Sequence, residues 1–276
     1  MKKILIQTDF SHVSCQTIDS VLKLFKNKTC DFYFLNTYTY NIKGLDALSL
    51  LHVDEEWYDK PKEESEDKLA KLIGYYTKKY LMSNHNFHSI SEYSTLVEAV
   101  KKHQQRLGID LVILSSGINE DLDKENKLVL EQIRECPVLL LPAITHIDNK
   151  LSITIAADFK QTINTDQIDQ FRLGLGRKKI EIGILVLDEQ NRLSEDVARN
   201  LKTFIAYLKQ FQNTKINLEY ARDKKQLKAY ASQHLNGIMC LVDKKPSFLR
   251  KIGLHKSHLV SRLKQLSTNS VLAIHQ

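Results

Sequence analysis

The sequence predicts an α/β protein made of two tandem copies of one parallel-sheet domain. Short apolar runs alternate with helical patterns along both halves, which is typical of a parallel sheet with helices on both faces. The second half repeats the order and spacing of the first, so that Thr8-Asp9-Phe10 aligns with Ala157-Asp158-Phe159 at an offset of 149 residues. We therefore expect two domains, residues 1–145 and 150–276, separated by a short polar segment.

The first half opens with the apolar run Ile4-Leu5-Ile6, which ends in Thr8-Asp9 and is followed by a helical pattern from Ser11. A buried strand that leads into a helix explains this change of period. The acidic stretch 54–67 fits either an ordered lid or the start of a helix. We expect strands at 3–8, 31–38, 88–93, 110–114 and 138–141, and helices at 11–25, 65–82, 96–107 and 127–134.

The second half alternates in the same way, and its opening strand ends in Asp158 as the first ends in Asp9. Ligands of open parallel sheets lie beyond the carboxyl ends of the strands, so both aspartates are candidate binding residues. We expect strands at 151–157, 180–187, 215–220, 237–242 and 271–275, and helices at 166–175, 194–211, 224–235 and 256–266.

Composition and charge narrow the functional classes. The 276 residues are 42% hydrophobic and 26% charged, as in globular proteins. Residues 1–150 carry 19 Lys and Arg against 22 Asp and Glu, whereas residues 151–276 carry 21 against 11, so the net charge of +7 arises in the second half. No helix-turn-helix, zinc-finger or aromatic RNA-binding pattern accompanies the basic residues, so we expect no nucleic-acid partner.

The sequence also indicates the cellular location of the protein and whether it carries a metal site or a catalytic site. No apolar run reaches the roughly 18–20 residues that span a bilayer, so we expect a cytoplasmic protein without a membrane partner. The four cysteines show no CxxC spacing, which favours buried reduced thiols. His85 and His88 are spaced like metal ligands but lack a companion carboxylate motif, and no nucleophile has an identifiable base. We therefore expect neither a metal site nor an enzyme.

Three segments carry a resemblance to a known family. They are KKILIQTDFSHVS at the opening strand, DLVILSSG at the fourth strand and CPVLLLPA at the end of the first half. In this order and spacing they resemble a universal stress protein domain, and the second half resembles a diverged copy. The resemblance implies flavodoxin-like, Rossmann-like sheets of five strands ordered 3-2-1-4-5. It also implies pairing through the fifth strand, either between the repeats or in a homodimer, and a role in stress physiology rather than catalysis.

Many members of that family bind ATP through the signature G-x2-G-x9-G-[ST] after the fourth strand. Glycines let backbone N–H groups approach phosphates, and the following helix N-terminus stabilises the anion. Here Ser115 stands at the first glycine position and Ile118 at the second. The Gly-Ser position falls on Leu128-Val129 when counted forward from Ile118, or on Lys124-Glu125 when counted back from Cys136-Pro137, and neither pair is Gly-Ser. Ser115, Ser116 and Gly117 remain candidate ligand contacts, but we expect this half not to bind ATP.

The second half departs from the signature differently. Asp243 and the lysines Lys244 and Lys245 end the fourth strand without a glycine, and Lys256-Ser257 lie within one residue of the Gly-Ser position. Ser257 can cap the last helix while Lys256 supplies positive charge. These lysines crowd the predicted place of Asp158, which fits either a phosphate or small-anion site or a solvated basic loop.

The two aspartates also allow two roles. The resemblance implies that Asp9 and Asp158 form hydrogen bonds at the adenosine end of a nucleotide pocket. The residues themselves allow a role without a ligand, in which each carboxylate accepts backbone N–H groups at the start of the following helix.

Together these features predict a binding or interaction module of the stress response, with degenerate nucleotide sites, no required cofactor and a protein partner that the sequence does not identify. The alternative is a sensor that binds ATP, another nucleotide or a related anion through the basic residues of the second half. A phosphotransfer or hydrolytic enzyme is the third reading.

Overall fold

The computed structural model describes residues 1–39, 55–81, 85–116, 124–142, 151–176, 180–189, 193–210, 216–243, 262, 266 and 268–276, with backbone only at 55–58. Its first half contains β1 (Lys2–Gln7), α1 (His12–Leu24), β2 (Cys30–Tyr38), α3 (Glu55–Lys79), β3 (Asn86–Tyr93), α4 (Leu96–Leu107), β4 (Leu111–Ser116), α5 (Lys124–Gln132) and β5 (Val138–Pro142). Its second half contains β6 (Leu151–Ala157), α6 (Asp166–Gly174), β7 (Ile180–Val186), α7 (Glu195–Lys209), β8 (Asn217–Tyr220), α8 (Lys224–Gln233), β9 (Ile238–Asp243) and β10 (Ser270–His275).

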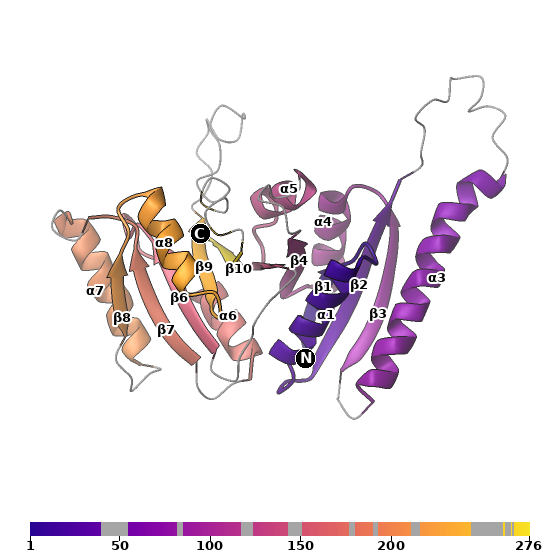
Figure 1. Cartoon of the computed structure of the whole chain (residues 1–276), viewed down its shortest axis with the longest axis horizontal. Coiled ribbons are helices and arrows are strands. Elements are labelled where there is room, and N and C mark those ends of the chain that lie inside the picture. Colours follow the sequence, from indigo (N-terminus) through magenta and orange to yellow (C-terminus); the bar gives the residue numbers. More distant parts are fainter. Residues whose placement is uncertain are drawn as a thin grey trace, which may run out of the picture.

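The strands form one ten-stranded sheet in the order β3-β2-β1-β4-β5-β10-β9-β6-β7-β8 (Figure 1). Each half has the order 3-2-1-4-5 with parallel pairing, which confirms the predicted α/β fold class. The halves meet where β5 and β10 pair antiparallel, with Leu139 opposite Leu272. The two five-stranded sheets are therefore continuous through their fifth strands.

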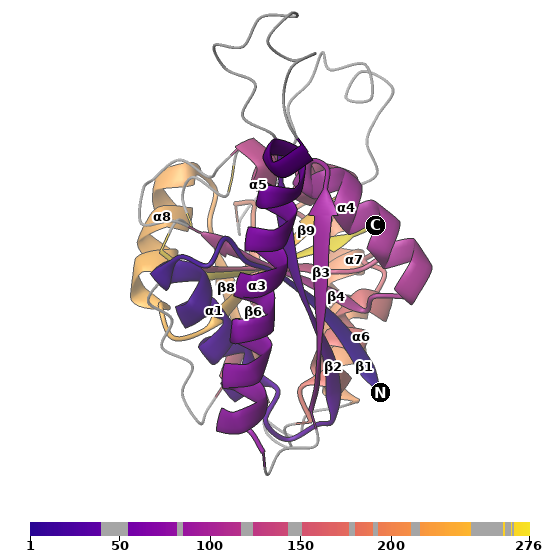
Figure 2. The same ribbon diagram turned by 90° about the vertical axis from the view of Figure 1, so that its right-hand side faces the viewer.

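Helices cover both faces of this sheet. Buried side chains of α1, α3, α6 and α7 pack in one core, and those of α4, α5 and α8 pack in the other. Strand β1 shows the alternation behind this division, because Ile4 and Ile6 point into the first core while Leu5 points into the second. Figure 2 faces the β3 edge and shows α3 running along the sheet in front of β2 and β3. No described helix is long and apolar enough to cross a membrane.

Most predicted elements match the observed ones to within a few residues, and the largest difference is at α3. This helix begins at Glu55 rather than near Ser65, so the acidic stretch is the start of a helix. The sequence pattern misses this part because Pro61 lies inside it and the side chains from 59 to 64 are mostly exposed, which leaves no apolar period.

Two other expectations fall largely on residues that are not described. The helix expected at 256–266 lies outside the described residues apart from Arg262 and Leu266, and the predicted boundary between the domains, at 145–150, lies outside them entirely. The division into residues 1–145 and 150–276 stays a prediction.

Candidate functional site

Asp9 and Asp158 occupy equivalent turns at the carboxyl ends of β1 and β6. The Oδ1 atom of Asp9 accepts a hydrogen bond from the N–H of Ser11 at 3.0 Å, and Oδ1 of Asp158 accepts one from the N–H of Lys160 at 3.2 Å. Ser11 is in turn the N-cap of α1. Each aspartate therefore holds the backbone two residues ahead of it. For Asp9 that residue is at the start of α1, whereas Lys160 lies six positions before α6 begins at Asp166, so the helix-start role fits Asp9 only.

The residue after each aspartate has a left-handed backbone conformation. Phe10 has φ of 62° and Phe159 has φ of 51°, and they are the only non-glycine residues with positive φ in the described part of the chain. A bulky residue there is strained, so the surrounding packing must hold it. The ring of Phe159 is buried, and its carbonyl accepts a hydrogen bond from Asn200 Nδ2 at 3.0 Å. The shared strain strengthens the case that the halves are repeats.

The carboxyl group of Asp9 is biased toward its charged form. Partial burial alone would raise its pKa, but hydrogen bonds from Ser11 and Ser14 outweigh burial and lower the pKa below its ordinary value. The charge of Asp9 thus serves the start of α1.

At the end of β4, Ser115 forms its hydrogen bonds to residues of the first half. Ser115 Oγ donates to Gln7 Oε1 at 3.4 Å, and its carbonyl accepts from Asn126 Nδ2 at 2.9 Å. Ser116 is buried, and its hydroxyl has no hydrogen-bond partner among the described residues. Gly117 lies outside the described residues. The carboxylate of Glu125, in the first turn of α5, accepts from the N–H of Leu96 at 3.2 Å and so caps α4.

The described part of the second-half site holds a buried ion pair that sequence reasoning did not find. Asp243 ends β9 with its side chain 2% exposed, and its Oδ2 lies 2.7 Å from Nη1 of Arg134. His275, which ends β10, places Nδ1 3.7 Å from the same oxygen. The predicted residues Lys244, Lys245, Lys256 and Ser257 lie outside the described residues.

The antiparallel junction explains how Arg134 of the first half reaches a second-half site. Because β5 runs opposite to β10, the segment before β5 lies beside the carboxyl end of β10. Gln167 of α6 ties this segment down, since its Nε2 donates to the Arg134 carbonyl at 3.0 Å while its Oε1 accepts from the His275 N–H at 2.8 Å. The sequence alone would indicate Arg134 as a partner of Asp243 only if the pairing of β5 with β10 were already known.

Arg262 links this ion pair to Asp158 electrostatically. Burial lowers the pKa of the Arg262 guanidinium, whereas the negative charges of Asp158 and Asp243 oppose that shift. The predicted Asp158 therefore belongs to a mixed cluster of acidic and basic groups rather than to a purely basic one.

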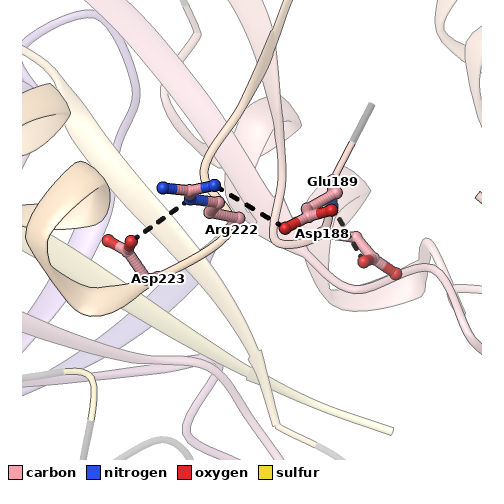
Figure 3. A pocket seen from close by; sticks show the side chains of 4 residues that line it. All are labelled: Asp188, Glu189, Arg222 and Asp223. Atoms are coloured by element: carbon pink, nitrogen blue, oxygen red, sulfur yellow. Dashed lines mark hydrogen bonds and ion pairs between the residues drawn. The ribbon is translucent and has the colours of Figure 1, made fainter. Parts of the chain in front are cut away.

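A separate cavity of about 480 Å³ lies where β7 and β8 end (Figure 3). It is lined by Asp188, Glu189, Arg222 and Asp223. Arg222 lies between two carboxylates, with Nη1 3.8 Å from Glu189 Oε1 and Nε 3.5 Å from Asp223 Oδ2. Three carboxylates around one guanidinium make this end of the sheet unfavourable for an anion.

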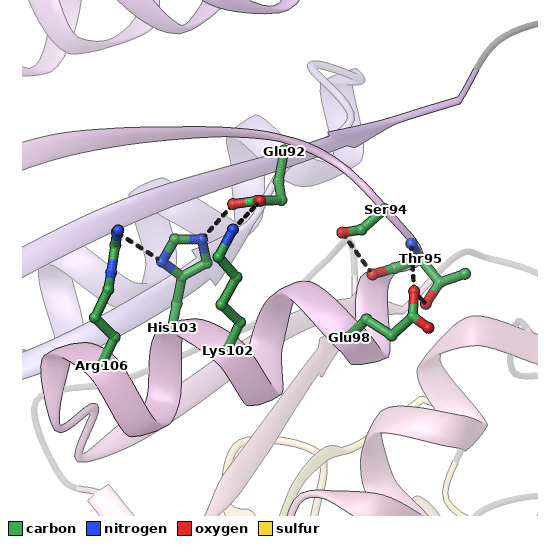
Figure 4. Close-up of polar contacts among 7 residues, drawn as sticks. All are labelled: Glu92, Ser94, Thr95, Glu98, Lys102, His103 and Arg106. Atoms are coloured by element: carbon green, nitrogen blue, oxygen red, sulfur yellow. Dashed lines mark hydrogen bonds and ion pairs between the residues drawn. The ribbon is translucent and has the colours of Figure 1, made fainter.

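A histidine network on α4 offers the strongest resemblance to a catalytic arrangement (Figure 4). His103 is 2% exposed, and its Nε2 lies 2.6 Å from Glu92 Oε2, while Lys102 contacts the other carboxylate oxygen, Oε1. Nη2 of Arg106 lies 3.0 Å from Nδ1 of His103. Because arginine only donates, Nδ1 accepts and Nε2–H donates to Glu92, so both ring nitrogens are occupied. The network holds α4 against β3 and leaves no nitrogen to act as a base.

The cysteines and the metal-binding residue types form no site in the described residues. All four thiols are free, and Cys30, Cys136 and Cys240 are buried. Burial raises the pKa of Cys30 to about 11 and that of Cys136 and Cys240 to about 12, which disfavours the reactive thiolate. Within the described ranges, no group of three or more His, Cys, Asp or Glu could hold a metal ion.

Comparison with known proteins gives matches at the level of structure. No protein-family model matches the sequence, and no curated protein gives a significant match. A universal stress protein from Archaeoglobus fulgidus DSM 4304 is similar over 99% of this chain and 98% of its own, with a TM-score of 0.68 and 14% identity. A universal stress protein candidate from Pseudomonas aeruginosa UCBPP-PA14 is similar over 100% and 93%, with a TM-score of 0.61 and 11% identity.

The fold extends to at least one protein with a different name. The cytoplasmic domain of a prokaryotic cation chloride cotransporter is similar over 99% of this chain and 94% of its own, with a TM-score of 0.55 and 10% identity. At such identities the likeness concerns the fold, because one fold hosts many functions. The chain therefore has the fold of universal stress protein structures, over both of its repeats.

Proposed function

We propose that the protein is a cytoplasmic, universal stress protein-like interaction module of the stress response, that it is not an enzyme, and that it needs no nucleotide. The observation that carries this proposal is the pair between Arg134 and Asp243. It puts a buried carboxylate, already neutralised by the other repeat, at the end of the fourth strand, where nucleotide-binding members of the family have their signature.

Electrostatics explains why this arrangement disfavours a triphosphate. A phosphate beside Asp243 would gain little attraction from Arg134, because the Asp243 carboxylate already compensates that positive charge. It would also have to draw Arg134 away from Asp243, and removing one partner of a buried pair costs about 3–5 kcal/mol. The geometry thus favours structural use of this position over nucleotide binding.

The first half supports the same conclusion by another route. The Glu125 carboxylate lies in the first turn of α5, where one of the two counts puts the Gly-Ser position, and it already accepts the N–H of Leu96. A negative side chain at that helix start opposes phosphate binding. Ser115 in place of glycine adds a side chain where a phosphate would approach the backbone.

The fifth strands bear on whether pairing at this edge occurs within one chain or in a homodimer. Strand β5 has β4 on one side and β10 on the other, and β10 has β5 and β9. Both fifth strands therefore have both edges occupied within one chain. We infer that the repeats are each other's partner at this edge and that a protein partner binds elsewhere.

Isothermal titration tests the proposal. The purified full chain is first checked by mass spectrometry for co-purified small molecules and then titrated with ATP, AMP and inorganic phosphate at low salt. We expect no binding heat and no co-purified nucleotide. ATP binding with micromolar affinity that Lys256→Glu abolishes would overturn the proposal in favour of the sensor, and nucleotide turnover that Asp9→Ala or Asp158→Ala abolishes would favour the enzyme.

A further inference from the structure

A groove between α1 and α3 begins beside Asp9, where Phe10 and His12 line it, and continues between the two helices. Four of its lining residues lie on one stripe of α1, and five more lie on one stripe of α3, so that two helix faces form its walls. The groove encloses about 480 Å³, within the range of small-molecule pockets. The complete lining is Phe10, His12, Cys15, Gln16, Asp19, Lys68, Lys71, Leu72, Tyr75 and Tyr76.

The body of the groove is aromatic. Tyr76 is 1% exposed, and its hydroxyl donates to the Cys15 carbonyl at 3.2 Å, which fixes the ring between the helices. Tyr75 is 56% exposed, so its ring is accessible from solvent, and it meets the Tyr76 ring edge to face with the ring centroids 5.0 Å apart. Phe10 adds a third ring to the lining, beside Lys68. Such rings offer flat apolar contacts for a planar molecule.

The charged groups of the groove favour an anion. Nζ of Lys68 lies 5.8 Å from the centroid of the Phe10 ring, and Lys71 lies one turn further along α3. Asp19 is the one carboxylate that lines the groove, and its Oδ1 forms an ion pair with Nζ of Lys79 at 2.8 Å. Lys68 also pairs with Glu64 at 3.6 Å, but both side chains are half-exposed, and such pairs contribute little. The start of α1 adds a favourable dipole at the same end.

We propose that this groove binds a small aromatic anion, with its ring against Tyr75, Tyr76 and Phe10 and its acidic group beside Lys68 and Lys71. The residues that line the groove include none of those that form the Arg134–Asp243 site. The proposed function rests on the Arg134–Asp243 pair, which lies outside this groove, so the inference goes beyond the proposed function and is tested separately.

One side chain provides a direct reporter of occupancy. Cys15 lines the groove and is half-buried, whereas the other three cysteines are buried. An alkylating agent should therefore react first at Cys15. Burial, together with the charges of Asp19 and Asp9, raises the pKa of the Cys15 thiol, so the reaction needs mildly alkaline buffer.

The test uses two probes that share one ring system. 8-Anilinonaphthalene-1-sulfonate carries an acidic group, and N-phenyl-1-naphthylamine is its uncharged counterpart. We expect the sulfonate to slow iodoacetamide alkylation of Cys15, measured by mass spectrometry, and the uncharged probe to protect it less. Cys15→Ser removes the signal and serves as the labelling control.

Charge variants separate a specific site from general dye binding. Lys71→Gln should weaken sulfonate binding by about threefold to fivefold, the loss expected for one exposed charge contact, while leaving the uncharged probe unaffected. Lys202→Gln, an exposed lysine on α7, should change neither. Gln16→Trp should fill the groove and block both probes. The proposal would be overturned if saturating sulfonate left the alkylation rate of Cys15 unchanged. It would also be overturned if the sulfonate bound with equal affinity to wild type, Lys71→Gln and Gln16→Trp.

Discussion

At the scale of single residues, buried and partly buried charges in this protein hold elements together. Glu92 joins β3 to α4 through His103 and Lys102, and Asp243 joins the two repeats through Arg134. Burying a charge is costly unless it is paired and hydrogen-bonded, so these pairs constrain the positions of the elements that carry them.

The pKa of Glu92 makes this role measurable. Partial burial alone would raise it, but hydrogen bonds from Lys102 and His103 outweigh burial and lower it below the ordinary 4.5. The stabilising contribution is therefore complete above pH 4.5 and disappears as the pH falls through the lowered pKa. Glu92→Gln should cost about 2 kcal/mol at pH 7. The gap to wild type, measured by urea denaturation, should narrow below pH 4.5.

The control for this variant is Glu63→Gln on the exposed face of α3, which should change stability little at either pH. A gap between Glu92→Gln and wild type that is the same at pH 7 and in acid would contradict the assignment.

Sequence reasoning at this scale identified the residues that follow a strand but not those that come from another element. Asp9 and Asp158 are visible because each ends an apolar run, and the structure gives them the same turn. Arg134 is invisible because its partner Asp243 lies 109 positions away, and only the β5–β10 pairing brings the two together.

At the scale of elements, two glycines in helices have opposite roles. Gly108 caps α4 with φ of 65°, a conformation that favours glycine, whereas Gly74 lies inside α3 with open space around its Cβ position. Gly108→Ala should therefore destabilise the protein by about 1 kcal/mol. Gly74→Ala should stabilise it by up to about 1 kcal/mol. Urea denaturation of the two variants measures both changes in the free energy of unfolding. Changes of the same sign would contradict the opposite roles of the two glycines.

Helix ends were predictable where their signals are local. The bounds of α4, Leu96–Leu107, are those expected, because Thr95 and Glu98 mark its start and Gly108 its end (Figure 4). The start of α3 was missed by about ten residues, because its first turns are charged and contain Pro61. An exposed helical extension leaves no hydrophobic period in the sequence.

At the scale of the whole molecule, the two repeats share one sheet and two continuous cores. Strands β5 and β10 lie at its centre, while β3 and β8 form its edges. Native-state hydrogen exchange should find the amides of β5 and β10 as well protected as those of β4 and β9, and those of β8 exchanging faster. Exchange at β5 and β10 much faster than in both flanking strands would mean that the repeats separate readily.

The most direct test of the central claim is a double-mutant cycle across the junction between the repeats. Arg134→Met and Asp243→Asn, alone and together, are compared with wild type by urea denaturation. Because Arg134 neutralises a buried carboxylate, Arg134→Met should cost about 3 kcal/mol, and the double variant should lose at least about 1 kcal/mol less than the sum of the single losses. Losses that add to within about 0.5 kcal/mol would show that the two residues do not interact, and would remove the observation on which the proposed function rests.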